Sequence, residues 1–397
     1  MELSDYEKKL VLEVLDSNQL TYGPMSRKFE RQFAKSHDCK CALFLNSGTS
    51  ALHVALAALK NRLGWSDGDE VIVPAVTFVA TSNIVLHNNM VPVFVDVEWD
   101  TYCMNPSKLE EKITPRTRAI IPVHLLGLPA SMDPINEIAQ MYHLAVIEDS
   151  CETMFAKYKG CSVGSMGDIS CFSTYLAHFL VTGVGGLVAT NDLELAADVR
   201  SLMNHGRDGI YISCSDDQNK DSLEFHEIIN RRFLFVNVGH SFRCTEMEAA
   251  IGLGQLARAD EIISKRKAIA KRLTQVLSKH QEFIQLPSCP PDRSHSCMLY
   301  GIVVRNSDKT SLVHFLEDMN IETRDMLPLI NQPIYKRLYG DIEKEYPVAR
   351  WINESGFYIG CHPYMKEKEV DFIIEAFDYY FRHYNKAPLR MHASMSS

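Results

Sequence analysis

Residues 70–95 read "EVIVPAVTFVATSNIVLHNNMVPVFV", two short apolar runs separated by a longer segment of mixed polarity. Short apolar runs rich in valine are typical of strands buried on both faces of a sheet. Similar runs alternate with amphipathic segments along residues 40–190. They are "CALFL" (41–45), "EVIVP" (70–74), "VPVFV" (91–95), "RAIIPV" (118–123), "LAVIE" (144–148), "ISCFS" (169–173) and "GLVAT" (186–190). The pattern predicts an α/β fold with a mostly parallel, seven-stranded sheet.

Length and spacing divide the chain into three predicted parts. Its 397 residues are enough for a large and a small domain. We expect an N-terminal arm and a large domain over residues 1–245, then one long connecting helix over 246–280, where apolar residues recur at helical spacing. A small α+β domain is expected over 281–397. The polar, irregular stretch 208–232 is expected to be an excursion or a loop.

Composition excludes several classes of protein. The chain has 46% hydrophobic residues, and its 41 Lys and Arg against 50 Asp and Glu give a net charge of −9. Basic residues form no long run, which argues against nucleic-acid and membrane partners. The N-terminus lacks the apolar core of a signal peptide, and no stretch approaches the roughly 20 apolar residues of a membrane span, so we expect a cytoplasmic protein. Eleven cysteines without a CxxC pair predict reduced thiols and no metal site.

A glycine-containing turn between an expected strand and an expected helix is the first candidate binding element. In "FLNSGTSALHVAL" (44–56), Gly48 and Thr49 stand at the start of the helical pattern. Backbone N–H groups at a helix N-terminus bind a phosphate well, and a glycine lets the phosphate come close to the backbone. An ordinary helix cap by Ser47 or Thr49 explains the same residues. The turn alone leaves both interpretations open.

Two further side chains follow strand ends. Asp149, in "AVIEDSCET" (145–153), comes at the end of a buried run, where open α/β sheets bind ligands. It could hold a protonated ring nitrogen or cap the next helix. Phe78, in "PAVTFVATSN" (74–83), could stack on a planar ring or pack in the core. The residues by themselves leave these alternatives open.

The order of these pieces resembles one family over nearly the whole chain, the DegT/DnrJ/EryC1/StrS group of pyridoxal-phosphate sugar aminotransferases. The matching stretches are "YGPMSRKFERQFA" (22–34), "LNSGTSALHVAL" (45–56), "GDEVIVPAVTFVATSN" (68–83), "PVHLLG" (122–127), "IEDSCET" (147–153), "VGSMGDISCFSTY" (163–175), "TGVGGLVATND" (182–192), "NHGRD" (204–208), "SFRCTEMEAAIGLGQL" (241–256) and "INQPIYKRL" (330–338). Ten ordered matches are far more specific than any single one of them.

The resemblance implies a pyridoxal-phosphate (PLP) dependent transferase of fold type I, with the cofactor held by the large domain. By this resemblance, Gly48 and Thr49 give backbone N–H groups to the cofactor phosphate, and Ser173 gives a hydroxyl. Phe78 stacks on the pyridine ring. Asp149 pairs with the ring nitrogen, which keeps the ring protonated and electron-withdrawing.

One position departs from the family pattern. Family aminotransferases carry a lysine in a segment resembling "SFYPTKNLTTGEGG", and this lysine forms the Schiff base with PLP. Residues 173–186 read "STYLAHFLVTGVGG" here, which places His178 where that lysine is expected. An imidazole cannot form a stable imine, but it can move protons at neutral pH. The resemblance therefore implies a noncovalently held cofactor, present as pyridoxamine phosphate (PMP) between turnovers, with His178 as the catalytic base.

The same replacement is a feature of a small branch of the family, the nucleotide-sugar 3-dehydratases, among them the enzyme acting on GDP-4-keto-6-deoxymannose. These enzymes remove the C3 hydroxyl of a nucleotide-linked 4-keto-6-deoxy sugar. Glu152 stands where aminotransferases usually have a glutamine near the cofactor, and an acid there is similar to the dehydratases. A helix-capping glutamate is the alternative for Glu152.

A relative in this branch holds an iron–sulfur cluster, on cysteines that follow a segment like "GRDCWC". Here residues 206–214 read "GRDGIYISC", with Gly209 and Tyr211 at two of those places. Cys151 and Cys214 do not complete a set of four thiolates, so no cluster is expected. The resemblance then implies that L-glutamate regenerates PMP, and that the dehydrated amino sugar loses ammonia on hydrolysis.

The family's active sites lie at a homodimer interface. By analogy, Ser241, in place of a family asparagine, and Arg243 reach the cofactor phosphate from the partner chain. His240 could contribute to the site or face solvent. Arg324, in "IETRD", could bind a substrate carboxylate or diphosphate, or form a surface ion pair.

Three hypotheses follow for the activity. We favour a PMP-dependent 3-dehydratase. A nucleotide-sugar aminotransferase of altered mechanism is the first alternative, and a non-catalytic family member kept for binding is the second. The sequence leaves open whether the nucleotide is GDP, CDP, UDP or dTDP.

Overall fold

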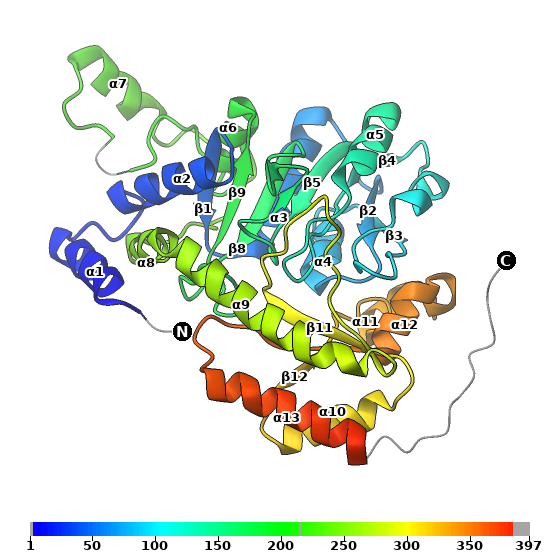
Figure 1. Cartoon of the computed structure of the whole chain (residues 1–397). Coiled ribbons are helices and arrows are strands. Elements are labelled where there is room, and N and C mark those ends of the chain that lie inside the picture. The colour runs from blue at the N-terminus through cyan, green and yellow to red at the C-terminus, as the bar shows by residue number, and fades with distance from the viewer. Residues whose placement is uncertain (1–2, 214–215, 384–397) are drawn as a thin grey trace.

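A mostly parallel sheet of seven strands lies at the centre of the chain (Figure 1). The computed structural model describes residues 3–213 and 216–383. The strands are β1 (Cys41–Leu45), β2 (Glu70–Pro74), β3 (Val91–Val95), β4 (Thr117–Ile120), β5 (Ala145–Asp149), β8 (Ile169–Ser173) and β9 (Gly186–Thr190). Their order is β1-β9-β8-β5-β4-β2-β3, and β9 runs antiparallel to both of its neighbours. The predicted fold class is confirmed.

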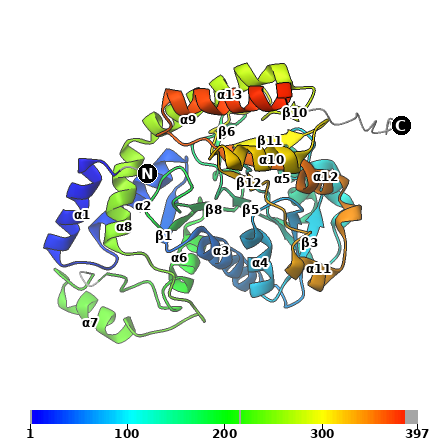
Figure 2. The ribbon, with the colours of Figure 1, turned by 90° about the horizontal axis from the view of Figure 1, so that it is seen from below.

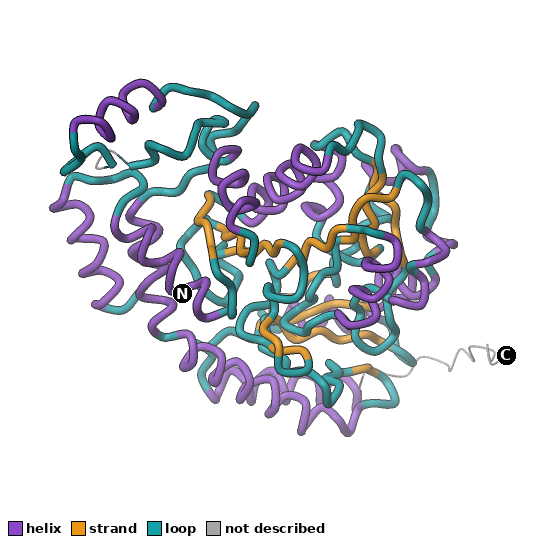
Figure 3. Tube along the Cα trace, turned by 90° about the horizontal axis from the view of Figure 1, so that it is seen from above, coloured by secondary structure: helices purple, strands orange, loops and turns teal. Residues whose placement is uncertain are grey.

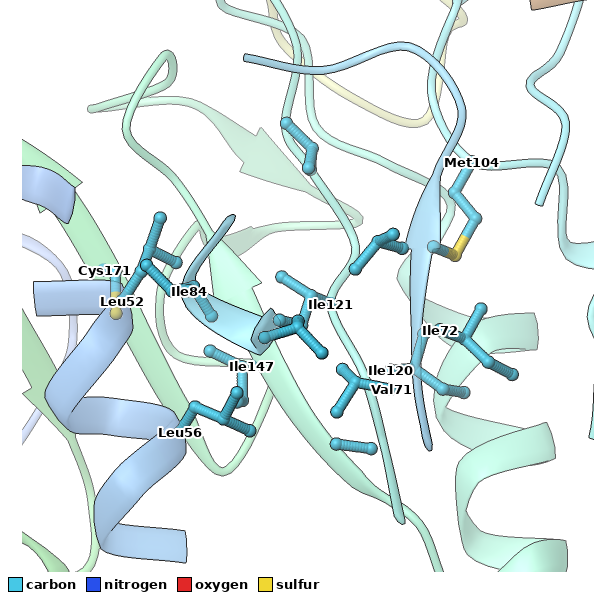
Figure 4. Close-up of a cluster of buried hydrophobic side chains, with 14 of the residues drawn as sticks. Leu52, Leu56, Val71, Ile72, Ile84, Met104, Ile120, Ile121, Ile147 and Cys171 are labelled. Atoms are coloured by element: carbon cyan, nitrogen blue, oxygen red, sulfur yellow. The ribbon is translucent and has the colours of Figure 1, made fainter. Parts of the chain in front are cut away.

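Helix α3 (Gly48–Leu63) covers the middle of this sheet. The helix begins where Ser47 Oγ accepts a hydrogen bond from Ser50 N at 3.0 Å, and it ends at Gly64, which adopts φ 67°. Figure 4 shows Leu52 and Leu56 of α3 among the apolar side chains of the sheet. Burial of each such leucine contributes about 1.5–3 kcal/mol, so the helix start is held firmly against the strand ends.

Five further helices and two short strands lie in the described part of the chain up to residue 202. They are α1 (Asp5–Ser17), α2 (Pro24–Ser36), α4 (Val79–His87), α5 (Met132–Tyr142), α6 (Leu193–Leu202), β6 (Lys157–Tyr158) and β7 (Cys161–Ser162). The short 3-10 turns are Pro106–Lys108, Glu110–Lys112, Ser278–His280 and Glu343–Glu345. Within the described residues, no helix is both long enough and apolar enough to span a bilayer.

A second, antiparallel sheet forms from the C-terminal part of the chain. Its order is β10 (Ile284–Gln285), β11 (Leu299–Val304), β13 (Gly356–Gly360) and β12 (Thr323–Asp325). Helices α10 (Lys309–Asp318) and α13 (Glu367–His383) pack on it, and α13 lies beside α9 (Ala259–Leu277; Figures 1 and 2). Helices α11 (Pro333–Tyr339) and α12 (Pro347–Ser355) instead bury side chains in the core of the first sheet. Residues before and after the predicted boundary at residue 281 therefore share one hydrophobic core.

The single helix expected over 246–280 is wrong. The structure has α8 (Glu246–Ala257) and α9 (Ala259–Leu277), with a break at Arg258, where φ is −109° and ψ is 10°. Helix α8 packs against α1, and Arg258 lies 3.5 Å from the buried carboxylate of Glu7. The bend lets α8 stay with the arm while α9 leads to the second sheet.

The stretch expected to be an excursion or a loop, 208–232, contains a helix. Helix α7 (Ser222–Arg231) starts at Asp221, whose carboxylate accepts hydrogen bonds from the N–H groups of Leu223 and Glu224, both at 2.9 Å. Figure 3 shows it projecting from the body of the molecule. Only Ile228 of this helix is buried, so a strong cap rather than packing marks its start.

We predict that Gly186→Ala destabilises the protein. An added Cβ on Gly186 would lie 2.4 Å from the carbonyl carbon and oxygen of Ser47, and 2.5 Å from Gly48 N. These are backbone atoms and cannot move aside easily, so we expect a loss of about 1–3 kcal/mol in the free energy of unfolding. Denaturant unfolding measures it. Gly209→Ala is the matched control, because nothing lies within 4 Å of its added Cβ; equal stability of the two variants contradicts the prediction.

Candidate active site

The carboxyl ends of β1, β5 and β8 meet at one edge of the large sheet. A Cβ added to Gly48, after β1, would lie 2.8 Å from Ser173 Cβ at the end of β8 and 2.8 Å from the Cys151 sulfur, two residues beyond β5. Only a glycine fits between these side chains. The sheet therefore brings Gly48, Ser173 and Asp149 together at the edge where open α/β sheets bind ligands.

The start of α3 has the features of an ordinary helix cap and also those of a phosphate-binding turn. Ser47 is the N-cap and binds Ser50 N, as an ordinary cap does. The N–H groups of Gly48 and Thr49 precede the first intrahelical hydrogen bonds, and the helix dipole favours an anion beside them. Ser173 Oγ accepts a hydrogen bond from Tyr175 N at 3.4 Å. The hydroxyl proton of Ser173 is therefore available for donation to a bound group. These groups fit a phosphate.

Asp149 is a buried carboxylate held by neutral donors. Thr81 Oγ1 donates to Oδ2 at 2.7 Å, and Cys151 N donates to Oδ1 at 3.1 Å. Burial raises the pKa of Asp149, although these hydrogen bonds oppose the rise. A protonated ring nitrogen would supply the positive charge that a buried carboxylate needs, so Asp149 fits a pyridinium. The helix-cap alternative for Asp149 is wrong, because the next helix along the chain is α6.

The neighbouring Glu148 serves the fold instead. Its carboxylate accepts the N–H groups of Gly164, Met166 and Gly167 at 2.6–2.8 Å and lies 2.9 Å from His124 Nε2. Because Ala130 N donates to His124 Nδ1, His124 donates its Nε2 proton to Glu148. Side chains alternate along a strand, so Glu148 points away from the side that Asp149 faces.

His178 lies in the turn after β8, with its imidazole oriented by one backbone bond. Its Nδ1 lies 2.5 Å from the carbonyl oxygen of Cys151, which can only accept, so Nδ1 carries the proton and Nε2 is bare in the neutral ring. Burial lowers the pKa of His178 to about 4, and the positive charge of Arg266 acts in the same direction. A neutral imidazole with a free Nε2 can accept a proton at pH 7.

Glu152 follows Cys151 in the chain and is buried. Leu126 N donates to its Oε2 at 3.1 Å. Burial raises the pKa of Glu152 to about 7, and the charge of Asp149 adds to the rise. The helix-cap alternative for Glu152 is wrong, since the chain continues from it into short strands rather than a helix. Near neutral pH, Glu152 can therefore hold or release a proton.

Phe78 is exposed and does not pack in the core. It occupies the N-cap position of α4, and 58% of its surface is accessible to solvent. The core alternative for Phe78 is therefore wrong, and its ring is free to stack on a planar group.

Three other predicted residues have local contacts elsewhere. Ser241 Oγ accepts Arg243 Nη2 at 3.1 Å, and His240 Nε2 lies 3.3 Å from His53 Nε2. Arg324 pairs with the exposed carboxylate of Glu322, as the surface ion-pair alternative predicts. None of these three contacts involves His178.

Sequence reasoning missed Thr81, which holds Asp149, and Tyr358, on whose hydroxyl the charge of Glu152 acts. Thr81, one helical turn after Thr77, binds both Thr77 Oγ1 at 2.7 Å and Asp149. Tyr358 lies opposite Arg324 in the second sheet, and burial raises its pKa, with the negative charge of Glu152 adding to the rise. The bond between Thr81 and Asp149 joins residues 68 positions apart in the chain, so no local pattern signals it.

Metal ligands do not gather in the described part of the chain. Residues 3–213 and 216–383 contain no group of three or more His, Cys, Asp or Glu side chains placed to hold a metal ion. Cys214, considered above as a thiolate ligand, lies outside the described residues.

The large mixed sheet with its appended antiparallel sheet, and the helix start beside a buried strand-end carboxylate, define a PLP-dependent transferase of fold type I. The chain belongs to the DegT/DnrJ/EryC1/StrS aminotransferase family, whose profile matches residues 2–378. This family comprises PLP-dependent enzymes that modify sugars.

Relatives of known name include both aminating and dehydrating enzymes. The chain is 35% identical to GDP-perosamine synthase of Caulobacter vibrioides over 381 residues, 95% of each chain. It is 31% identical to dTDP-4-dehydro-2,6-dideoxy-D-glucose 3-dehydratase of Saccharopolyspora spinosa, over 94% of this chain and 84% of the relative. The structure of E. coli GDP-4-keto-6-deoxy-D-mannose-3-dehydratase with bound hydrated PLP is similar with a TM-score of 0.82 at 26% identity, over 95% of this chain and 97% of that one.

We predict that Asp149→Asn weakens cofactor binding at least about tenfold, equivalent to about 1.4 kcal/mol. Asparagine keeps the size of the side chain but removes the negative charge that a protonated ring nitrogen would pair with. Titration of the variant with PLP, followed by absorbance, measures the dissociation constant. Asp133→Asn is the control, because Asp133 pairs with Lys159 at the surface. Unchanged affinity of the Asp149 variant contradicts the assignment.

Proposed function

We propose that the protein is a PMP-dependent 3-dehydratase of a nucleotide-linked 4-keto-6-deoxy sugar. The observation that carries the proposal is His178, a neutral imidazole with a bare Nε2 in the place where family aminotransferases have their lysine. Such a side chain keeps the lysine's ability to move a proton and lacks its ability to bond covalently to the cofactor.

The residues divide the work as follows. Gly48, Thr49 and Ser173 would hold the cofactor phosphate, and Asp149 would hold the ring nitrogen. When bound, PMP would supply an amine that can condense with the C4 ketone and a C4′ carbon acidic enough to give up a proton, and the electrons left by that proton would expel the C3 hydroxyl. His178 would accept that C4′ proton at Nε2 and deliver it to the departing C3 hydroxyl, which leaves as water.

The proposed reaction balances with L-glutamate as the reductant. The keto sugar and glutamate give the 3-deoxy keto sugar, 2-oxoglutarate and ammonia. Glutamate returns PLP to PMP, and hydrolysis of the dehydrated amino sugar releases the ammonia. We include a homodimer in the proposal, with the partner subunit's Ser241 and the partner's Arg243 near the phosphate, because both side chains are exposed and bond to each other.

Two of the relatives support dehydration. Both the Saccharopolyspora relative and the E. coli neighbour carry 3-dehydratase in their names, and the latter binds hydrated PLP. The aldehyde carbon of hydrated PLP carries two hydroxyls, so it cannot be bonded to a lysine at the same time. The GDP-perosamine synthase relative favours the second candidate, amination of the same class of sugar.

We expect native protein given PMP, glutamate and a panel of GDP-, CDP-, UDP- and dTDP-4-keto sugars to release ammonia and a product lighter by one oxygen, seen by mass spectrometry. His178→Asn should lose this activity at least about a hundredfold, the usual contribution of a general base, and still bind PLP. An amino-sugar product would instead establish the aminotransferase alternative. Failure of the native protein to bind PLP would leave only the non-catalytic alternative.

A second prediction concerns Glu152. Its pKa of about 7 puts its titration inside the working pH range, whereas His178 titrates near 4. The protonated carboxyl can donate a hydrogen bond to the bound ligands, so we expect kcat to fall as the pH rises through about 7. Glu152→Gln cannot ionise, and its profile should be flat between about pH 6 and 8. A variant that keeps the native transition would show that another group titrates there.

A further inference from the structure

Arg266 of α9 is a buried cation whose hydrogen bonds reach three separate segments. Its Nη1 donates to the carbonyl oxygens of Met298 at 2.7 Å and Cys361 at 2.8 Å, and its Nη2 donates to the carbonyl oxygen of His178 at 3.0 Å. Met298 immediately precedes β11, and Cys361 immediately follows β13. Arg266 therefore joins the second sheet to the turn that carries His178.

The partners of Arg266 are neutral, which is unusual for a buried guanidinium. The residue is 4% exposed, and burial lowers its pKa. A buried charge without a carboxylate is costly, and a salt bridge would be the simpler way to stabilise it. Three carbonyl oxygens that lie in different directions need several donors held in fixed positions. The rigid, planar guanidinium group provides these donors, and the ammonium group of a lysine does not.

The turn around His178 is exposed before this residue and buried after it. Tyr175 and Leu176 before it are more than half exposed, at 54% and 56%, whereas Phe179 and Leu180 after it are fully buried. The guanidinium of Arg266 lies over the Phe179 ring, 5.1 Å from its centroid. Arg266 thus fixes the backbone at the point where the exposed turn enters the core.

We propose that Arg266 is a positioning residue for His178. By holding the main-chain carbonyl of His178 from the side of the second sheet, it directs Nδ1 of the imidazole to the Cys151 carbonyl and leaves Nε2 available for proton transfer. This inference rests on the proposed role of His178 as the base. It goes further in making the second sheet, through α9, part of the machinery that aims the base.

The test measures the ionisation of His178 itself. In PLP-bound protein labelled with ¹³C at histidine Cε1, the His178 signal is assigned by its absence in His178→Asn and followed by NMR against pH. Loss of the Arg266 charge and of the buried geometry both favour the charged imidazole. We expect the midpoint to rise by about one pH unit in Arg266→Met, and by less in Arg266→Lys, which retains the charge without the fork. Deoxygenation should fall at least about tenfold in Arg266→Met, with little change in KM.

Arg272→Lys is the control on the same helix, because Arg272 pairs with Asp371 at the surface and should leave both midpoint and rate unchanged. If the Arg266 variants melt earlier but His178 keeps its native midpoint, Arg266 is merely structural and the inference is overturned. If Arg266→Met does not fold, the midpoint in Arg266→Lys decides in the same way. If the native protein removes no oxygen from any sugar but the midpoint still moves, the proposed function fails while the positioning role stands.

Discussion

The hydrogen bond from His178 Nδ1 to the carbonyl oxygen of Cys151 is the interaction on which the site depends. It fixes the tautomer, so that Nε2 is the atom available for proton transfer. The N–H group of the same residue, Cys151, donates to Asp149. One short stretch of backbone therefore orients the residue proposed to act on the proton and the residue proposed to hold the ring, and a shift of that backbone would move both.

The fold supplies the rigidity that this arrangement needs. Asp149 ends β5, Ser173 ends β8, and Gly48 follows β1, so the three segments are placed by the register of buried strands. Glu148 ties the loop at 164–167 to β5 from the other face of the sheet. Burial of this network also keeps His178 neutral and Glu152 close to its midpoint at pH 7, because a low dielectric disfavours charge. Burial alone thus gives His178 and Glu152 protonation states that suit proton transfer.

Much of the fold could be predicted from the sequence because buried strands have a strong local signature. The runs at 41–45, 70–74 and 186–190 match β1, β2 and β9 to the residue. The bend at Arg258 could not be predicted in this way, since apolar spacing continues across it and the cause is packing against the N-terminal arm. Thr81 and Arg266 escaped notice for the same reason: their bonds to Asp149 and His178 join residues 68 and 88 positions apart. Sequence pattern identifies which residues could do chemistry, and tertiary contacts decide how they are aimed.

The central claim is that the cofactor is held without a covalent bond, beside an imidazole that acts as the base. Borohydride reduction of the protein loaded with one equivalent of PLP, followed by intact mass under denaturing conditions, tests this most directly, because reduction makes any lysine–PLP bond permanent. We predict the unmodified mass, with all PLP released. A stoichiometric gain of one reduced PLP per chain would show that another lysine anchors the cofactor and would contradict the account.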